Sequence, residues 1–129
     1  MFIVTGAGGF IGFHVAKMLE DDGNEVIIFD HKTVSELKTN YSFLKPKKIY
    51  KPDKIFDFIN TNYKKIISVI HMGANSSTAE KNLSLLINNN FQYTLDLFQA
   101  CNKYSIKFIY ASSAATYGDG SKGFDDQNS

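Results

Sequence analysis

Short apolar runs alternate along the chain with longer stretches in which apolar residues recur at helical spacing. Each short run is bounded by polar or small residues, which is typical of a buried strand. We therefore expect strands at 2–4, 26–29, 66–70 and 108–110, with a short edge strand near 49–50. The helical spacing predicts helices at 11–22, 53–63 and 80–104. Asp53 can cap the second helix, because its side chain can accept hydrogen bonds from N–H groups of the first turn.

Buried strands separated by helices predict a parallel sheet that is covered on both faces. We expect an α/β fold with a doubly wound parallel sheet, the Rossmann fold, with about five strands and right-handed crossovers. Ligands of such sheets bind in the crevice at the carboxyl ends of the strands. In this chain those ends are the segments 5–6, 30, 71–73 and 111–113.

Composition narrows the classes of function. The chain has 129 residues, which suits one domain, and a formal net charge of +1. All 14 basic residues are Lys, and a near-neutral chain without Arg is a poor candidate for nucleic-acid binding. The single cysteine, Cys101, cannot form a disulfide within the chain and is expected in the core. No apolar run reaches the roughly 18 residues that span a membrane, so we expect a cytoplasmic protein.

A glycine-rich turn follows the first expected strand and opens the first helix. Gly6 suits a tight turn, Gly9 lets a pyrophosphate approach the backbone, and Gly12 lets the helix pack closely on the strand. The helix N-terminus offers N–H groups and a positive dipole end to a phosphate. Asp30 ends the next strand, at the distance expected for an acid that binds ribose. A turn that serves packing alone would explain Gly6 and Gly12 but not Asp30, so a dinucleotide site is predicted.

The choice between NAD and NADP stays open on these residues. The Asp30 carboxylate can accept from the ribose 2′-OH and repels a 2′-phosphate, which favours NAD. Four nearby cationic or titratable side chains could offset that repulsion: His31, Lys32, Lys38 and Lys54.

The other strand ends carry small and polar residues. A bound dinucleotide would pass Met72, Gly73, Ala74, Asn75 and Ser76, although Ser77 and Thr78 could equally be helix caps. His71 ends a buried strand and is expected to be a hydrogen-bonded structural residue.

Ser113, at the last strand end, could donate a hydrogen bond to a substrate oxygen. We find no hydrolase triad, the Gly-x-Ser-x-Gly motif is absent, and no metal site is predicted.

Several motifs resemble one known family. Thr5-Gly6-x-x-Gly9-x-x-Gly12 is similar to the pattern of the extended short-chain dehydrogenase/reductases, which include NAD-dependent epimerases and dehydratases. The segments 71–78, 89–91 and 110–120 closely resemble the ADP-L-glycero-D-manno-heptose 6-epimerases. The resemblance covers nearly the whole chain and is weakest from 31 to 52.

The resemblance implies a site and an activity. Members of this family bind NADP and epimerise one carbon of a nucleotide sugar, here ADP-heptose for lipopolysaccharide, by removing and returning a hydride. Ser113 would polarise the reacting sugar oxygen, and a homo-oligomer is expected for the full-length enzyme. The implied contacts to NADP, with NAD as the other possibility, come from Phe10 and Ile11 through the backbone, and from Asp30, His31, Lys54, Met72 to Ser76 and Asn89.

One family motif is not found where the family carries it, after Ser113. Hydride chemistry of this type needs a Tyr base and a Lys that lowers its pKa, which the family carries as Tyr-x-x-x-Lys beyond the position of Ser113. No such pair follows Ser113 here. We therefore expect residues 1–129 to be the incomplete NAD(P)-binding Rossmann domain of a longer epimerase, inactive alone. The alternatives are another UDP- or GDP-sugar epimerase or dehydratase, or a dinucleotide-binding module without catalysis.

Overall fold

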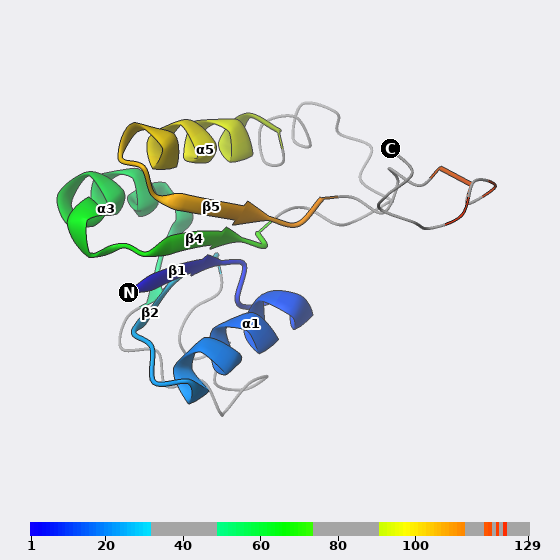
Figure 1. The fold of residues 1–129 in the computed structure, drawn as a ribbon, viewed down its shortest axis with the longest axis horizontal. Helices are drawn as coiled ribbons and strands as arrows, with labels where there is room; N and C mark the ends of the chain where they lie inside the picture. The colour runs from blue at the N-terminus through cyan, green and yellow to red at the C-terminus, as the bar shows by residue number, and fades with distance from the viewer. Residues whose placement is uncertain (32–48, 74–90, 113–117, 120, 122, 124–129) are drawn as a thin grey trace.

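The computed structural model describes residues 1–31, 49–73, 91–112, 118, 119, 121 and 123. The described chain alternates strands with helices and short 3₁₀ turns (Figure 1). The strands are β1 (Phe2–Thr5), β2 (Val26–Phe29), β3 (Ile49–Tyr50), β4 (Ser68–His71) and β5 (Lys107–Tyr110). The helices are α1 (Phe10–Asp21), α3 (Ile55–Asn62) and α5 (Tyr93–Lys103), and the 3₁₀ turns are η1 (Pro52–Lys54) and η2 (Tyr63–Lys65).

The strands form one parallel sheet in the order β3-β2-β1-β4-β5. The order reverses at β1, which is the arrangement of a doubly wound sheet, so the predicted fold class is confirmed. In this register Thr5 pairs with Phe29 on one side and with His71 on the other. The carboxyl ends of β1, β2 and β4 therefore meet at one edge of the sheet. The glycine turn, Asp30 and the segment 71–73 lie at these strand ends.

Each face of the sheet has its own core. Apolar side chains of α3 and α5, including Ile59 and Leu97, pack with Ile3 and Val69 on one face. Phe13 and other side chains of α1 pack on the opposite face, and Figure 1 shows α1 on the other side of the sheet from α3 and α5. Because both faces are covered at the centre, β1, β2 and β4 are almost completely buried.

The expected elements agree closely with the observed ones, including the short edge strand at 49–50. The strand expected from 66 begins at Ser68, after the η2 turn. The long helix expected at 80–104 is described only as α5, and its first part lies outside the described residues. Cys101 is fully buried, and burial raises the pKa of its thiol to about 11, which fits the predicted core role.

The predicted helix cap at Asp53 is wrong. Asp53 lies inside η1, and the residue that caps α3 is Lys54, with no side-chain hydrogen bond to the first turn. Pro52 begins the 3₁₀ turn, since its fixed φ suits a first helical position and it has no N–H to satisfy. Asp53 therefore lies inside the 3₁₀ turn, one residue before the N-cap of α3.

Candidate functional site

The glycine turn between β1 and α1 is shaped by close backbone contacts. Gly6 has φ +70°, a conformation that favours glycine. A Cβ at Gly6 would also lie 2.6 Å from the backbone N and Cα of Gly73, at the end of β4. Gly6 is therefore required both for the turn and for the close approach of the neighbouring strand end, and the sequence indicated only the turn.

Gly12 and Gly9 differ in what requires them. A Cβ at Gly12 would lie 2.3 Å from the carbonyl oxygen of Gly6, so helix and turn could not pack as they do. Gly9 has an ordinary backbone conformation, φ −92° and ψ 167°, and a Cβ there would meet only the Gly6 oxygen at 3.4 Å. The fold itself therefore tolerates a side chain at Gly9. Its absence leaves the backbone open to a group approaching from outside, which is what a pyrophosphate needs.

The N-terminus of α1 has the electrostatics of an anion site. Gly9 is the N-cap and offers no side-chain hydrogen bond, and the first turn contains no acidic residue. The N–H groups of a first helical turn have no partners within the helix, and the helix dipole is positive at this end. Phe10 and Ile11, at the first two positions of α1, have strongly exposed side chains.

Asp30 lies at the mouth of the glycine turn. It follows β2, is 8 % exposed, and its Oδ2 accepts a hydrogen bond of 2.7 Å from the N–H of Gly8. Its own N–H donates to the carbonyl of Tyr50 at 3.0 Å, which ties it to the end of β3. The acid and the phosphate-binding turn are thus held together, as a site for the ribose and pyrophosphate of one dinucleotide requires.

A buried hydrogen-bond network joins the ends of β1 and β4. Thr5 Oγ1 lies 2.6 Å from His71 Nδ1 and accepts from the N–H of Gly73 at 3.1 Å. The other ring nitrogen, His71 Nε2, lies 2.9 Å from the hydroxyl oxygen of Thr94 on α5. Burial lowers the pKa of His71 below its ordinary value of 6.5, so the ring is held neutral between its two hydroxyl partners.

This network confirms His71 as a structural residue, and it contains two residues that sequence reasoning missed. Thr5 and Thr94 were given no role, although Thr5 determines where Gly73 lies relative to the glycine turn. The sequence offered one indication of this contact: Thr5 and His71 each directly follow an expected strand. That signal becomes informative only when the strands are known to be neighbours in this register.

The structure places some predicted contact residues at the site and leaves others undescribed. Met72 is partly buried, and its N–H donates to the Thr5 carbonyl at 3.2 Å. His31 is exposed beside Asp30, whereas exposed Lys54 lies on η1 with Nζ 3.3 Å from Asp53 Oδ2. The predicted residues that lie outside the described part of the chain are Ala74, Asn75, Ser76, Asn89 and Ser113.

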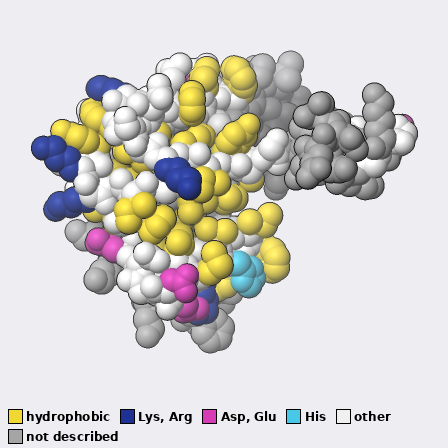
Figure 2. Space-filling view, viewed as in Figure 1, with side chains coloured by type: hydrophobic (Ala, Val, Ile, Leu, Met, Phe, Trp, Pro, Cys, Tyr) yellow, Lys and Arg dark blue, Asp and Glu magenta, His cyan; other side chains and the backbone are white. Residues whose placement is uncertain are grey.

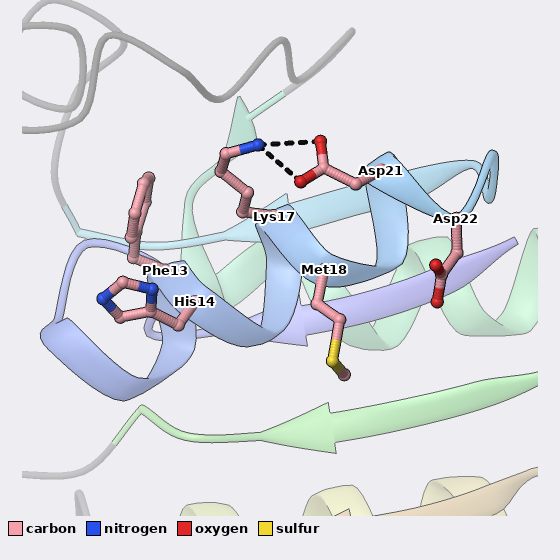
Figure 3. Close-up of a pocket in the computed structure, with 6 residues that line it drawn as sticks. All are labelled: Phe13, His14, Lys17, Met18, Asp21 and Asp22. Atoms are coloured by element: carbon pink, nitrogen blue, oxygen red, sulfur yellow. Dashed lines mark hydrogen bonds and ion pairs between the residues drawn. The ribbon is translucent and has the colours of Figure 1, made fainter.

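A hollow lies on the surface along α1. It is lined by Phe13, His14, Lys17, Met18, Asp21 and Asp22 (Figure 3). Lys17 Nζ bonds both oxygens of Asp21, at 2.7 and 2.5 Å, so these opposite charges are paired with each other.

Two kinds of feature are not found in the described ranges. No group of three or more His, Cys, Asp or Glu side chains there could hold a metal ion. The helices that the structure describes are also too short or too polar to cross a membrane.

Comparison with known proteins agrees with this geometry. The NAD dependent epimerase/dehydratase family matches residues 2–129, nearly the whole chain. The chain belongs to this family. A curated relative from Fusobacterium nucleatum is named ADP-L-glycero-D-manno-heptose-6-epimerase. It is 39 % identical over an alignment 137 residues long, which covers 98 % of this chain and 39 % of the relative. The chain spans about two fifths of the length of the curated relatives it matches.

Solved structures of the same kind superpose on this fold. The ADP-L-glycero-D-manno-heptose-6-epimerase of Helicobacter pylori gives a TM-score of 0.73 at 25 % identity, over 91 % of this chain and 40 % of that one. The UDP-glucuronic acid 4-epimerase of Bacillus cereus, solved in complex with NAD, gives 0.71 at 25 % identity, over 92 % and 41 %. Both likenesses support the fold and the resemblance found in the motifs.

Proposed function

We propose that residues 1–129 form the NAD(P)-binding part of a nucleotide-sugar epimerase. The observation that carries the proposal is the bond between Gly8 and Asp30, which holds a carboxylate at the mouth of a phosphate-binding glycine turn. The pyrophosphate would lie over Gly9 and accept hydrogen bonds from the first-turn N–H groups of Phe10 and Ile11. Asp30 would accept from the adenosine ribose, with His31 and Lys54 nearby, and the end of β4 from Met72 onward would line the remaining length.

The dinucleotide supplies the group that takes up a hydride and returns it when the sugar carbon is epimerised. This chain's contribution is to bind and orient that group. The buried Thr5–His71 network holds Gly73 against the turn, which keeps the floor of the cofactor site fixed. Ser113, which follows β5 outside the described residues, would donate to the reacting sugar oxygen. Further contacts with the cofactor are proposed for four residues outside the described part of the chain: Ala74, Asn75, Ser76 and Asn89.

The proposed substrate is ADP-heptose, in a cytoplasmic pathway that feeds lipopolysaccharide. The names of the curated relatives and of the Helicobacter pylori structure support it. A UDP-sugar is the second candidate, since the Bacillus cereus structure bears the name of a UDP-sugar epimerase. NADP is the proposed cofactor and NAD the other candidate, and the complete enzyme is proposed to form a homo-oligomer. Residues 1–129 alone are proposed not to turn over substrate, because no Tyr-x-x-x-Lys pair follows Ser113.

Dinucleotide binding tests the cofactor part of this proposal. Titration calorimetry of the purified protein with NADP and with NAD should show saturable binding of at least one. Gly9→Ala should weaken that binding at least about tenfold, because a methyl group would stand where the pyrophosphate approaches. The melting temperature of this variant should match the wild type, since the backbone at Gly9 is ordinary and uncrowded. Absence of binding to either dinucleotide would overturn the proposal.

A further inference from the structure

Lys51 links the carboxyl ends of β3 and β2. It follows Tyr50 directly, and its Nζ donates a hydrogen bond of 2.5 Å to the main-chain carbonyl oxygen of His31. In the same region the N–H of Asp30 donates to the carbonyl of Tyr50. The pairs 30–31 and 50–51 therefore lie side by side, and the Lys51 ammonium is fixed beside the residue that follows Asp30.

The charge of Lys51 is available to a ligand. An ammonium has three donors, and the bond to His31 uses one of them. Lys17 and Lys54 have carboxylates of Asp21 and Asp53 within 4 Å, whereas the described residues place no carboxylate at that distance from Lys51. Lys51 is exposed, so an incoming anion can reach it. Sequence reasoning selected Lys54 for a phosphate of the cofactor and passed over Lys51.

We propose that Lys51 is a specificity-determining residue, which favours a dinucleotide with a phosphate on its adenosine ribose over one with a free 2′-hydroxyl. The inference rests on the proposed function, because it concerns the same cofactor site. Asp30 alone disfavours such a phosphate by charge repulsion. The Lys51 ammonium, held at the carbonyl of His31, offsets that repulsion. The same ammonium contributes much less to the binding of a neutral 2′-hydroxyl. Lys51 therefore acts mainly on the choice between NADP and NAD.

The test is the ratio of the two dissociation constants, Kd for NAD over Kd for NADP, on the full polypeptide that the gene encodes. Lys51→Gln removes the charge but keeps an N–H donor for the His31 carbonyl. We expect it to lower the ratio about tenfold, almost entirely through weaker NADP binding. Lys51→Arg keeps the charge and should leave the ratio near the wild-type value. Lys65→Gln is the matched control, because Lys65 is also exposed but precedes β4, at the amino end of that strand.

Three outcomes overturn the inference. Unchanged affinities for both dinucleotides in Lys51→Gln show that the charge has no role in cofactor binding. An equal loss of both affinities shows that Lys51 only positions the chain between β2 and β3. A ratio that changes in Lys54→Ala but not in Lys51→Gln assigns the phosphate to Lys54 instead. If the wild type binds neither dinucleotide, the proposed function falls and this inference falls with it, whereas the first three outcomes leave the proposed function intact.

Discussion

The centre of the sheet and its β5 edge are built differently. In β1 and β4 nearly every residue is buried, and each strand pairs with a neighbour on both sides. In β5 three of four residues are exposed, and within the described chain this strand pairs only with β4. The dinucleotide end of the proposed site therefore stands on the best-packed strands, whereas Ser113 follows the least-packed one.

Two of the three exposed residues of β5, Ile109 and Tyr110, are apolar, and the third is Lys107. Phe108 is stacked with Tyr110 at 6.0 Å between ring centroids and meets Phe98 of α5 edge-on at the same distance. Tyr110, Ile109 and Phe98 are 56, 41 and 48 % exposed. Figure 2 shows hydrophobic side chains at the surface between the α1 side and the upper part of the molecule. The β5 edge thus adds a ladder of hydrogen bonds to the sheet but little core, and substitutions should separate the two regions clearly.

The largest effect is expected at the turn in the well-packed region. Gly12→Ala places a Cβ 2.3 Å from the Gly6 carbonyl oxygen and 2.8 Å from its carbon, and the obstacle is backbone that cannot move aside cheaply. We expect a loss of about 3 kcal/mol or more in the free energy of unfolding, measured by urea denaturation. Gly9→Ala, three residues earlier, is the control and should unfold like the wild type. Equal stability of the two variants would contradict the crowding seen at Gly12.

A smaller effect is expected from the network behind the turn. His71→Leu removes the ring partner of the buried Thr5 hydroxyl and of the partly buried Thr94 hydroxyl, while Thr5 keeps its bond to the Gly73 N–H. We expect a cost of about 2 kcal/mol at pH 7.5, because both hydroxyls lose a hydrogen bond in a site that water does not readily reach. Thermal or urea unfolding measures it, and the exposed His14, changed to Gln, is the control.

The same variant has a defined pH dependence. The pKa of folded His71 is lowered from 6.5, so the unfolded chain binds its proton more readily. The stability that neutral His71 supplies is therefore complete above about pH 6.5 and is lost as the pH falls below it. The difference between wild type and His71→Leu should shrink from pH 7.5 to pH 5. A difference that stays constant would show that folding does not change the pKa of His71.

The sequence predicted those features of the fold that depend on local pattern. The apolar runs located the strands, and the spacing of Gly6, Gly12 and Asp30 located the turn and its acid. Individual side-chain contacts between residues distant in sequence were not predicted. The role of Thr5 depends on His71, which lies 66 residues away, and the role of Lys51 depends on His31, which lies 20 residues away. The error at Asp53 was local, because Pro52 starts a 3₁₀ turn one residue earlier than the cap that was expected.

The smallest effect is expected on β5 itself. Ile70 and Ile109 are directly paired neighbours on β4 and β5, but Ile70 is 8 % exposed and Ile109 is 41 % exposed. Replacement of Ile109 by Thr should change the free energy of unfolding by less than about 1 kcal/mol, because the Ile109 side chain is already partly exposed to water in the folded protein. Ile70→Thr, the matched variant, should cost about 2 kcal/mol or more, since it buries a hydroxyl and removes packed methyl groups.

The ratio of these two effects measures how far β5 belongs to the core of the folded protein. If Ile109→Thr is as costly as Ile70→Thr, Ile109 is covered in solution by something other than the described residues. In that case the β5 edge, and with it the position of Ser113, is supported by packing that the described chain does not provide. If Ile109→Thr is nearly neutral, the folded monomer leaves the apolar β5 edge uncovered, and a decrease in self-association in light scattering would show that copies of the chain associate through this edge. The well-packed centre would then support the dinucleotide end of the site without help from β5.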